Sequence, residues 1–243
     1  MAATARPDGR SADALRQVRI LPHFVPTAHG SALIEIGETR VICTCAVEES
    51  VPGWRRGTGA GWVTAEYGML PASTGERRMR DVTRGKLDGR SSEIQRLIGR
   101  SLRAVVDMQA LGERTLWIDC DVLTADGGTR CASICGGYVA LELAMRRLLS
   151  EGRLDRTPII AAVAAVSVGI VDAQCRLDLG YFEDSRADAD MNVVVSGVGE
   201  LIEVQATAEG RSFPRSQFDE LLDLALAGTQ TLLGIQADAL ASA

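Results

Sequence analysis

The sequence has little of several residue types that often carry catalysis or metal binding. Its 243 residues include one lysine, two histidines and 4% aromatic residues. Two histidines are too few for a histidine-rich metal site. The single lysine, Lys86, lacks the upstream glycine and the downstream Ser or Thr of a nucleotide-binding phosphate loop. A Gly-x-Ser-x-Gly nucleophile elbow is also missing.

Long apolar runs are absent as well. No stretch reaches the roughly 18 consecutive apolar residues that a membrane-spanning helix needs. The first ten residues are not followed by the apolar segment of a secretory signal. We therefore expect a cytoplasmic protein with no membrane partner.

Cysteine is present six times, but not in the paired Cys-x2-Cys spacing of a zinc site. Cys43 and Cys45 alternate within a strand-like run, and Cys131 and Cys135 lie four apart in a helix-like run. This pattern favours buried free thiols in a reducing compartment.

Charge is unevenly distributed along the chain. The whole chain has a net charge of −6, whereas residues 55–103 contain eleven basic and five acidic residues, a local excess of +6. Arginine supplies all but one of the basic residues in the chain, and arginine binds phosphate in a bidentate manner. The segment fits a nucleic-acid contact and a solvated surface equally well.

The order of predicted elements is strands, helices, strands, helix. Residues 31–36 and 41–47 predict a hairpin around the turn at 37–40. Ser92 and Gln95 have capping-box spacing at the start of a first helix. Further strands are predicted at 115–123, 162–171, 176–181, 191–195 and 201–207, and further helices at 131–149 and after Pro214.

This order indicates an α+β fold with mixed sheets and packed helices. We expect one domain over residues 1–243. Strands within 15–49 and 158–210 surround helices within 91–110 and 130–150, as an internal duplication would arrange them. The sequence identity between the two strand regions does not establish a duplication.

Two glycine- or arginine-containing turns precede predicted helices. Gly128, Thr129 and Arg130 lie between a strand and a helix, where backbone N–H groups, a hydroxyl and a guanidinium can surround an oxyanion such as phosphate. Arg90 lies just before the first helix in the same way. The alternatives are a βα turn with a Thr cap and an exposed, unengaged Arg90.

Residues 183–190 contain four acidic side chains between two predicted strands, and Asp184 and Asp190 lie near its two ends. Such carboxylates suit Mg²⁺ or Mn²⁺, although a solvated acidic turn has the same composition. Together with the arginines, a divalent ion held there would relieve the repulsion when phosphate attacks a phosphodiester. That chemistry requires no histidine base, since phosphate brings its own nucleophilic oxygen.

At these residues the chain resembles the bacterial ribonuclease PH family. The resemblance runs from Arg6 to the final helix, and its long collinear matches are far more specific than any single motif. The matching stretches are residues 61–71, 89–90, 93–103, 119–130, 164–170, 184–185, 190–194 and 202–210.

The resemblance implies a ribosomal protein S5 domain 2-like fold and a homo-hexamer built as a trimer of dimers. It implies phosphorolytic 3′→5′ trimming of tRNA precursors and of other RNA 3′ ends, with rRNA as a further substrate. Inorganic phosphate would be the co-substrate and nucleoside diphosphates the products. The reverse reaction would add nucleotides. The alternative is a catalytically silent, RNA-guiding ring subunit of an exosome-like assembly.

The resemblance also assigns residues. Arg90 and the run Gly128, Thr129 and Arg130 would bind phosphate, with Arg90 also catalytic. Asp184 and Asp190 would be catalytic and would hold Mg²⁺ or Mn²⁺. Arg77 and Arg80 would line the RNA entrance. Ala72 departs from the arginine expected after Pro71, which leaves the grip of this loop on RNA open.

Overall fold

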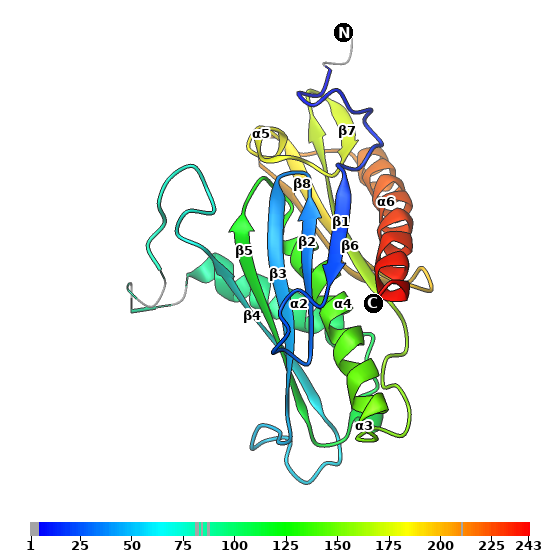
Figure 1. The fold of residues 1–243 in the computed structure, drawn as a ribbon. Helices are drawn as coiled ribbons and strands as arrows, with labels where there is room; N and C mark the ends of the chain where they lie inside the picture. Colours follow the sequence, from blue (N-terminus) through cyan, green and yellow to red (C-terminus); the bar gives the residue numbers. More distant parts are fainter. Residues whose placement is uncertain (1–4, 81–82, 84, 87, 210) are drawn as a thin grey trace.

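Two β-sheets with helices packed between and over them make up the molecule (Figure 1). The computed structural model describes residues 5–80, 83, 85–86, 88–209 and 211–243. Asp81 and Arg84, which belong to the basic segment, lie outside the described residues, as do the first four residues and Gly210. The α+β prediction is confirmed.

The first sheet has the strand order β1–β2–β3–β5–β4. Its strand β4 runs parallel to β5, and the other neighbours are antiparallel. The predicted hairpin is confirmed, because β2 and β3 pair from Ile36 and Thr39 outward. The bounds are β1 (Val18–Pro22), β2 (Gly30–Ile36), β3 (Thr39–Glu48), β4 (Trp62–Met69) and β5 (Thr115–Thr124).

Alternating side chains give the first sheet one apolar face. In β3, Val41, Cys43 and Cys45 are fully buried while the residues between them are more exposed. Helix α4 (Thr129–Ser150) covers this face, and its Gly136 permits the close approach. A Cβ at Gly136 would lie 2.8 Å from the Cys43 Sγ, well inside van der Waals contact.

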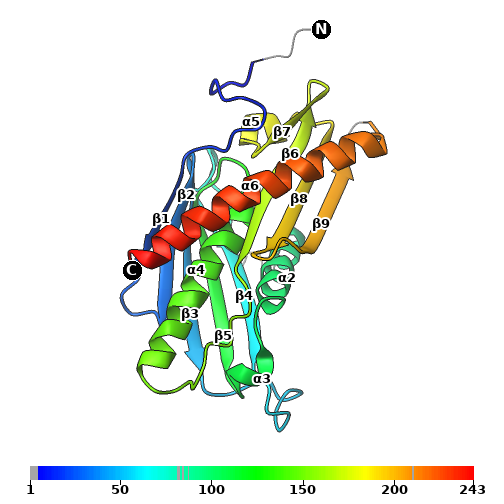
Figure 2. The same ribbon diagram turned by 90° about the vertical axis from the view of Figure 1, so that its right-hand side faces the viewer.

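The second sheet has the order β7–β6–β8–β9, all antiparallel. Every residue of its strand β6 is buried, because α4 packs on one side and α6 (Arg215–Ala241) on the other. Figure 2 shows α6 crossing this sheet diagonally. One apolar core cluster spans both sheets. The strands are β6 (Val163–Val171), β7 (Gln174–Leu177), β8 (Ala189–Ser196) and β9 (Leu201–Ala208).

The first helix begins earlier than the capping-box spacing predicts. Helix α2 (Gly89–Arg103) has Asp88 at its N-cap, and Ser92 donates its backbone N–H to the Asp88 carbonyl within the first turn. The prediction of a cap at Ser92 is therefore wrong. Arg90 lies inside the first turn of α2 rather than before the helix.

The same helix also ends earlier than the expected residue 110. It stops at Arg103, Val106 bridges to Ile159, and a separate short helix α3 (Met108–Leu111) follows. Asp107 starts α3 by accepting hydrogen bonds from the N–H groups of Gln109 and Ala110. The cap at Asp107 therefore separates two helices where the apolar pattern predicted a single one.

The predicted strand 176–181 is wrong beyond Leu177. Asp178 adopts a left-handed φ of 52°, and residues Tyr181–Asp184 form the short helix α5. Strand β4 was missed, although Val63 and Tyr67 alternate with more exposed residues as a half-buried strand requires.

All six cysteines are buried and free, as expected. Burial raises the pKa of Cys135 to about 12 and raises that of Cys45 further still. Within the described ranges, no helix has both the length and the apolarity to cross a bilayer.

Candidate active site

The turn between β5 and α4 forms a compact backbone cradle. Gly127 and Gly128 have φ values of 76° and 67°, in the left-handed region that glycine adopts without strain. A Cβ at Gly127 would lie 2.6 Å from the Leu179 carbonyl oxygen, so a side chain there would clash. Gly128 is the N-cap of α4, and no side chain in the described part of the chain caps this helix start. The first N–H groups of α4 therefore point out of the helix without an intrahelical acceptor.

Thr129 is held in the cradle by a strand of the first sheet. Its hydroxyl lies 2.9 Å from the Tyr67 hydroxyl of β4. Burial raises the pKa of Tyr67, and the hydrogen bond to Thr129 together with Arg90 and Arg130 opposes this shift. The parallel pairing of β4 with β5 brings these two hydroxyls together.

Two arginines from different helices reach the cradle. Arg130 Nη1 lies 2.9 Å from the Gln205 Oε1 of β9 and 3.3 Å from the Glu93 Oε1 of α2. Arg90 is exposed, and its side chain forms no hydrogen bond or ion pair with another described residue. One guanidinium is thus oriented by neighbours while the other can turn toward a ligand.

The two predicted carboxylates lie beside these arginines. Asp184 ends α5, and Asp190 is the second residue of β8. Asp184 is exposed, yet desolvation by the surrounding protein raises its pKa, against the opposing charges of Arg90 and Arg130. Burial likewise raises the pKa of Asp190, and the charge of Asp184 adds to this shift. The charge of Asp184 therefore acts on Asp190 within the same site.

Two adjoining cavities, of about 640 and 560 Å³, bring the predicted residues together. Both cavities are lined by Arg90, Gly128, Thr129 and Asp184. The 560 Å³ cavity, which we call the anion cavity, also contains Arg130, Ser167, Asp190, Asn192 and Gln205 in its wall.

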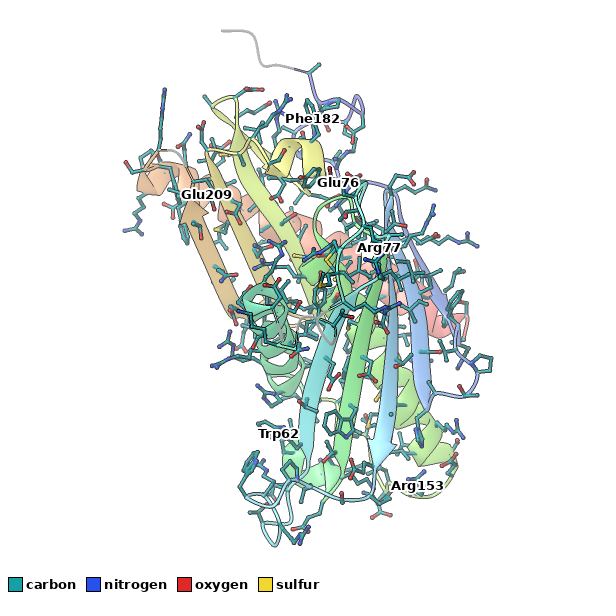
Figure 3. The ribbon with its side chains drawn as sticks, turned by 90° about the vertical axis from the view of Figure 1, so that its left-hand side faces the viewer. Trp62, Glu76, Arg77, Arg153, Phe182 and Glu209 are labelled. Carbon is teal, nitrogen blue, oxygen red and sulfur yellow. The ribbon has the colours of Figure 1, made fainter. Side chains whose placement is uncertain are left out.

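The loop after β4 contributes to the 640 Å³ cavity through Glu76 and Arg78. The predicted Arg77 and Arg80 are exposed on this loop, and neither lines the two cavities. Figure 3 shows Glu76 and Arg77 in the same half of the molecule as Phe182 of α5 and Glu209, with Trp62 at the opposite end. Arg78 was not singled out from the sequence, because nothing in a run of similar arginines distinguishes it.

A network of buried arginines from the N-terminal segment supports the site. Arg6 binds the Glu183 carboxylate with two hydrogen bonds of 2.9 and 2.7 Å, and both side chains are buried. Glu183 directly precedes Asp184, so this pair fixes α5. Arg16 binds the Asp178 carboxylate at 2.7 and 3.0 Å and also donates to the Asp126 carbonyl oxygen, beside the cradle.

This network makes stability depend on acid pH. Burial alone would raise the pKa of Asp178, but the hydrogen bond and charge of Arg16 outweigh it and lower the pKa. A carboxylate with a lowered folded-state pKa stabilises the fold above its unfolded-state pKa, and this contribution is lost as pH falls through the folded value. We expect stability to fall on acidification below about pH 4. Melting temperatures measured between about pH 7 and pH 2 would show this loss.

The substitution Asp178→Asn tests the source of that loss. The variant should melt at a lower temperature at neutral pH, because the buried Arg16 loses its charged partner. Its further loss on acidification should be smaller than in the unaltered chain. Asp155→Asn, at an exposed position, serves as the matched control. An undiminished acid loss in Asp178→Asn would contradict the assignment.

Both parts of the chain match known family models. Residues 14–146 match domain 1 of the 3′ exoribonuclease family, and residues 161–228 match domain 2. The chain therefore belongs to the 3′ exoribonuclease family.

Within that family, its relatives include proteins named Ribonuclease PH. The Syntrophomonas wolfei protein of that name is 57% identical over 231 residues, which cover 95% of this chain and 97% of the relative. The Nocardia farcinica protein is 56% identical over 237 residues, covering 97% and 92%. The resemblance seen in the sequence is thereby confirmed.

Solved structures agree on the fold. A chain of an Archaeoglobus fulgidus exosome with RNA bound to the active site superposes with a TM-score of 0.80 at 23% identity, covering 95% of this chain and 92% of that one. Rice (Oryza sativa) Rrp46 gives a TM-score of 0.78 at 16% identity, covering 97% and 100%. The expected ribosomal protein S5 domain 2-like fold is confirmed.

Proposed function

We propose that this chain is a phosphorolytic 3′→5′ exoribonuclease that trims the 3′ ends of tRNA precursors and other RNAs, rRNA included. The observation that carries the proposal is the convergence of Arg90, Arg130, the Gly128 turn and two carboxylates on the anion cavity. The sequence identity of 57% and 56% to two Ribonuclease PH relatives, along nearly the whole chain, supports the same activity.

In this mechanism inorganic phosphate binds to the N–H groups at Gly128–Arg130 and to the two arginines. A phosphate oxygen attacks the phosphorus of the last phosphodiester, and the bond from phosphorus to the 3′ oxygen of the preceding nucleotide breaks. The products are a nucleoside diphosphate and an RNA one nucleotide shorter. Arg90 and Arg130 stabilise the charge that develops on the phosphoryl oxygens. The reverse reaction adds a nucleotide and releases phosphate.

Asp184 and Asp190 would hold a divalent ion, Mg²⁺ or Mn²⁺, and assist the leaving 3′ oxygen. No group of three or more His, Cys, Asp or Glu side chains in the described part of the chain is arranged to hold a metal. Two carboxylates nevertheless suit Mg²⁺, which keeps several waters and takes further ligands from substrate phosphates. The raised pKa values of both carboxylates fit this role, because a bound cation would relieve their mutual repulsion. When bound, the ion would neutralise charge on the transferring phosphoryl group.

The RNA end would enter over the loop after β4. Arg77 and Arg80 are exposed there and available to RNA phosphates, and Arg78 lines the adjoining cavity. Exposed arginines bind the RNA backbone without reading its sequence. This arrangement suits an enzyme that accepts many 3′ ends.

Assembly and location complete the proposal. We infer a homo-hexamer, a trimer of dimers, in which several copies of the basic loop surround one RNA path; the likeness to exosome chains supports an assembly of subunits. We also infer one functional domain over residues 1–243, supported by the core cluster shared by both sheets. Six free, buried cysteines support a reducing, cytoplasmic location.

Product analysis with radiolabelled phosphate tests the activity. We expect label in nucleoside diphosphates, and no release when phosphate is omitted. Nucleoside monophosphates released without phosphate would indicate a hydrolytic metal-dependent nuclease instead. RNA binding without any product would indicate the alternative, a silent RNA-guiding subunit, which the presence of Arg90, Arg130, Asp184 and Asp190 disfavours.

A further inference from the structure

Ser167 of β6 carries a buried hydroxyl with no hydrogen-bond partner among the described residues. The residue is only 8% exposed. Buried polar groups are nearly always paired, since leaving one unpaired costs stability. An unpaired hydroxyl on a residue in the wall of a functional cavity therefore indicates a group that a bound ligand would satisfy.

The hydroxyl lies beside the N-terminus of α4. Ser167 lines the anion cavity together with Thr129, Arg130 and Asp190. A Cβ placed on Gly128 would lie 3.8 Å from the Ser167 Oγ, so the hydroxyl adjoins the uncapped helix start. Ser167 thus borders the anion cavity beside the first N–H groups of α4, with its hydroxyl covered by the protein. A rotation about χ1, which serine makes readily, would turn the hydroxyl toward the cavity.

The position of Ser167 is fixed by its backbone. The Ser167 carbonyl oxygen accepts a 2.7 Å hydrogen bond from the Asp178 N–H, and Ser167 pairs with Asn192 in the register of β6 and β8. Asp178 is in turn held by Arg16. The backbone cannot easily move to satisfy the hydroxyl elsewhere.

Two other buried polar atoms also lack partners within the described ranges, Ser73 Oγ and Gln236 Oε1. Neither residue lines the anion cavity or its neighbour. Ser133, one helical turn after Thr129, has a buried hydroxyl that is satisfied by the Thr129 carbonyl oxygen at 2.8 Å. Ser167 thus differs from these residues because its hydroxyl is unpaired and the residue lines the anion cavity.

We propose that Ser167 is a further ligand of inorganic phosphate, donating its hydroxyl hydrogen to a phosphate oxygen at the N-terminus of α4. The inference rests on the proposed phosphorolytic function for the identity of the anion. A hydrogen bond to a charged acceptor is strong, and this one would form at a site shielded from bulk water. The unpaired hydroxyl destabilises the free protein, and the hydrogen bond to phosphate removes this destabilisation.

The variant Ser167→Ala separates this role from a structural one. Without phosphate, it should melt at or above the temperature of the unaltered chain, because the substitution removes an unpaired polar group. Added inorganic phosphate should raise its melting temperature less, corresponding to about tenfold weaker binding. In steady-state assays the KM for phosphate should rise about tenfold, with kcat and the KM for RNA changed less than about twofold.

Ser73→Ala and Ser133→Ala are the matched controls, since one removes an unpaired hydroxyl outside the cavities and the other a satisfied one near the cradle. Both should keep the phosphate-dependent rise in melting temperature. Ser167→Cys, close to serine in volume and a weaker donor, should give an intermediate loss and covers the case in which the alanine variant folds poorly.

An unchanged phosphate response in Ser167→Ala would overturn the inference, and so would a raised KM for RNA alone, which would assign the hydroxyl to the RNA strand. Failure of the proposed function would look different. The unaltered chain would then release no diphosphates and would show no stabilisation by phosphate.

Discussion

Asp190→Asn should lower kcat by roughly 10²–10⁴-fold while RNA still binds. This range is typical for losing a side chain that takes part in proton transfer or charge stabilisation during the reaction. The asparagine keeps the shape of the side chain and removes its negative charge. Asp190 lies at the second position of β8, where pairing with β6 and β9 fixes its backbone. The expected loss is therefore one of chemistry rather than of folding.

The electrostatics explain the size of that effect. Burial and the charge of Asp184 both raise the pKa of Asp190, so keeping it ionised costs free energy in the free protein. A divalent cation bound at Asp184 and Asp190 would offset this cost. An uncharged asparagine cannot offer the same stabilisation.

Steady-state assays with labelled RNA would measure kcat, and filter binding would measure RNA affinity. Asp188→Asn is the matched control, because Asp188 lies two residues earlier and outside both cavities. It should keep most of the activity. If Asp190→Asn were as active as Asp188→Asn, the acidic segment would be a solvated turn after all.

The cradle could be predicted from the sequence because its parts are contiguous. Gly128, Thr129 and Arg130 are consecutive, and a strand-to-helix turn sets their relative positions by local geometry alone. The predicted carboxylates line the same cavity as the predicted phosphate ligands only because the fold brings β8 and α5 beside α4. The family resemblance implied this arrangement, whereas the residue pattern alone did not.

The supporting network could not be predicted in this way. Arg6 and Glu183 are separated by 177 positions, and no periodicity connects them. Ser167 is a small residue in an all-buried strand, so its sequence context indicates only a core position. Its role depends on which hydroxyls find partners, and that depends on the complete packing.

The predicted boundaries of helices and strands were wrong where two local sequence signals competed. Ser92 offered a capping box, but Asp88 starts α2 four residues earlier by its backbone geometry. Near Tyr181, an apolar strand pattern continued in sequence while Asp178 turned the backbone into the left-handed region. The hydrogen bond from the buried Arg16 to Asp178 compensates for that unusual backbone conformation. Short-range residue propensities cannot predict such a distant partner.

Arg130→Ala should raise the KM for phosphate by roughly 10–150-fold, which corresponds to losing a charge-assisted contact of about 1.5–3 kcal/mol. The guanidinium is oriented in advance by Gln205 and Glu93, so little side-chain freedom is lost when phosphate binds. Its removal also takes a positive charge from Asp184 and Asp190, whose ionised forms it stabilises. A smaller fall in kcat should accompany the rise in KM.

Arg100→Ala provides the control for this change, because Arg100 pairs with Glu203 of β9 at an exposed position away from the cavities. It should leave phosphate use within about twofold, as exposed pairs contribute little. Arg130→Lys should recover part of the loss, since it restores the charge without the two-pronged geometry. Equal phosphate KM values for Arg130→Ala and Arg100→Ala would mean that the helix start and Arg90 bind phosphate by themselves.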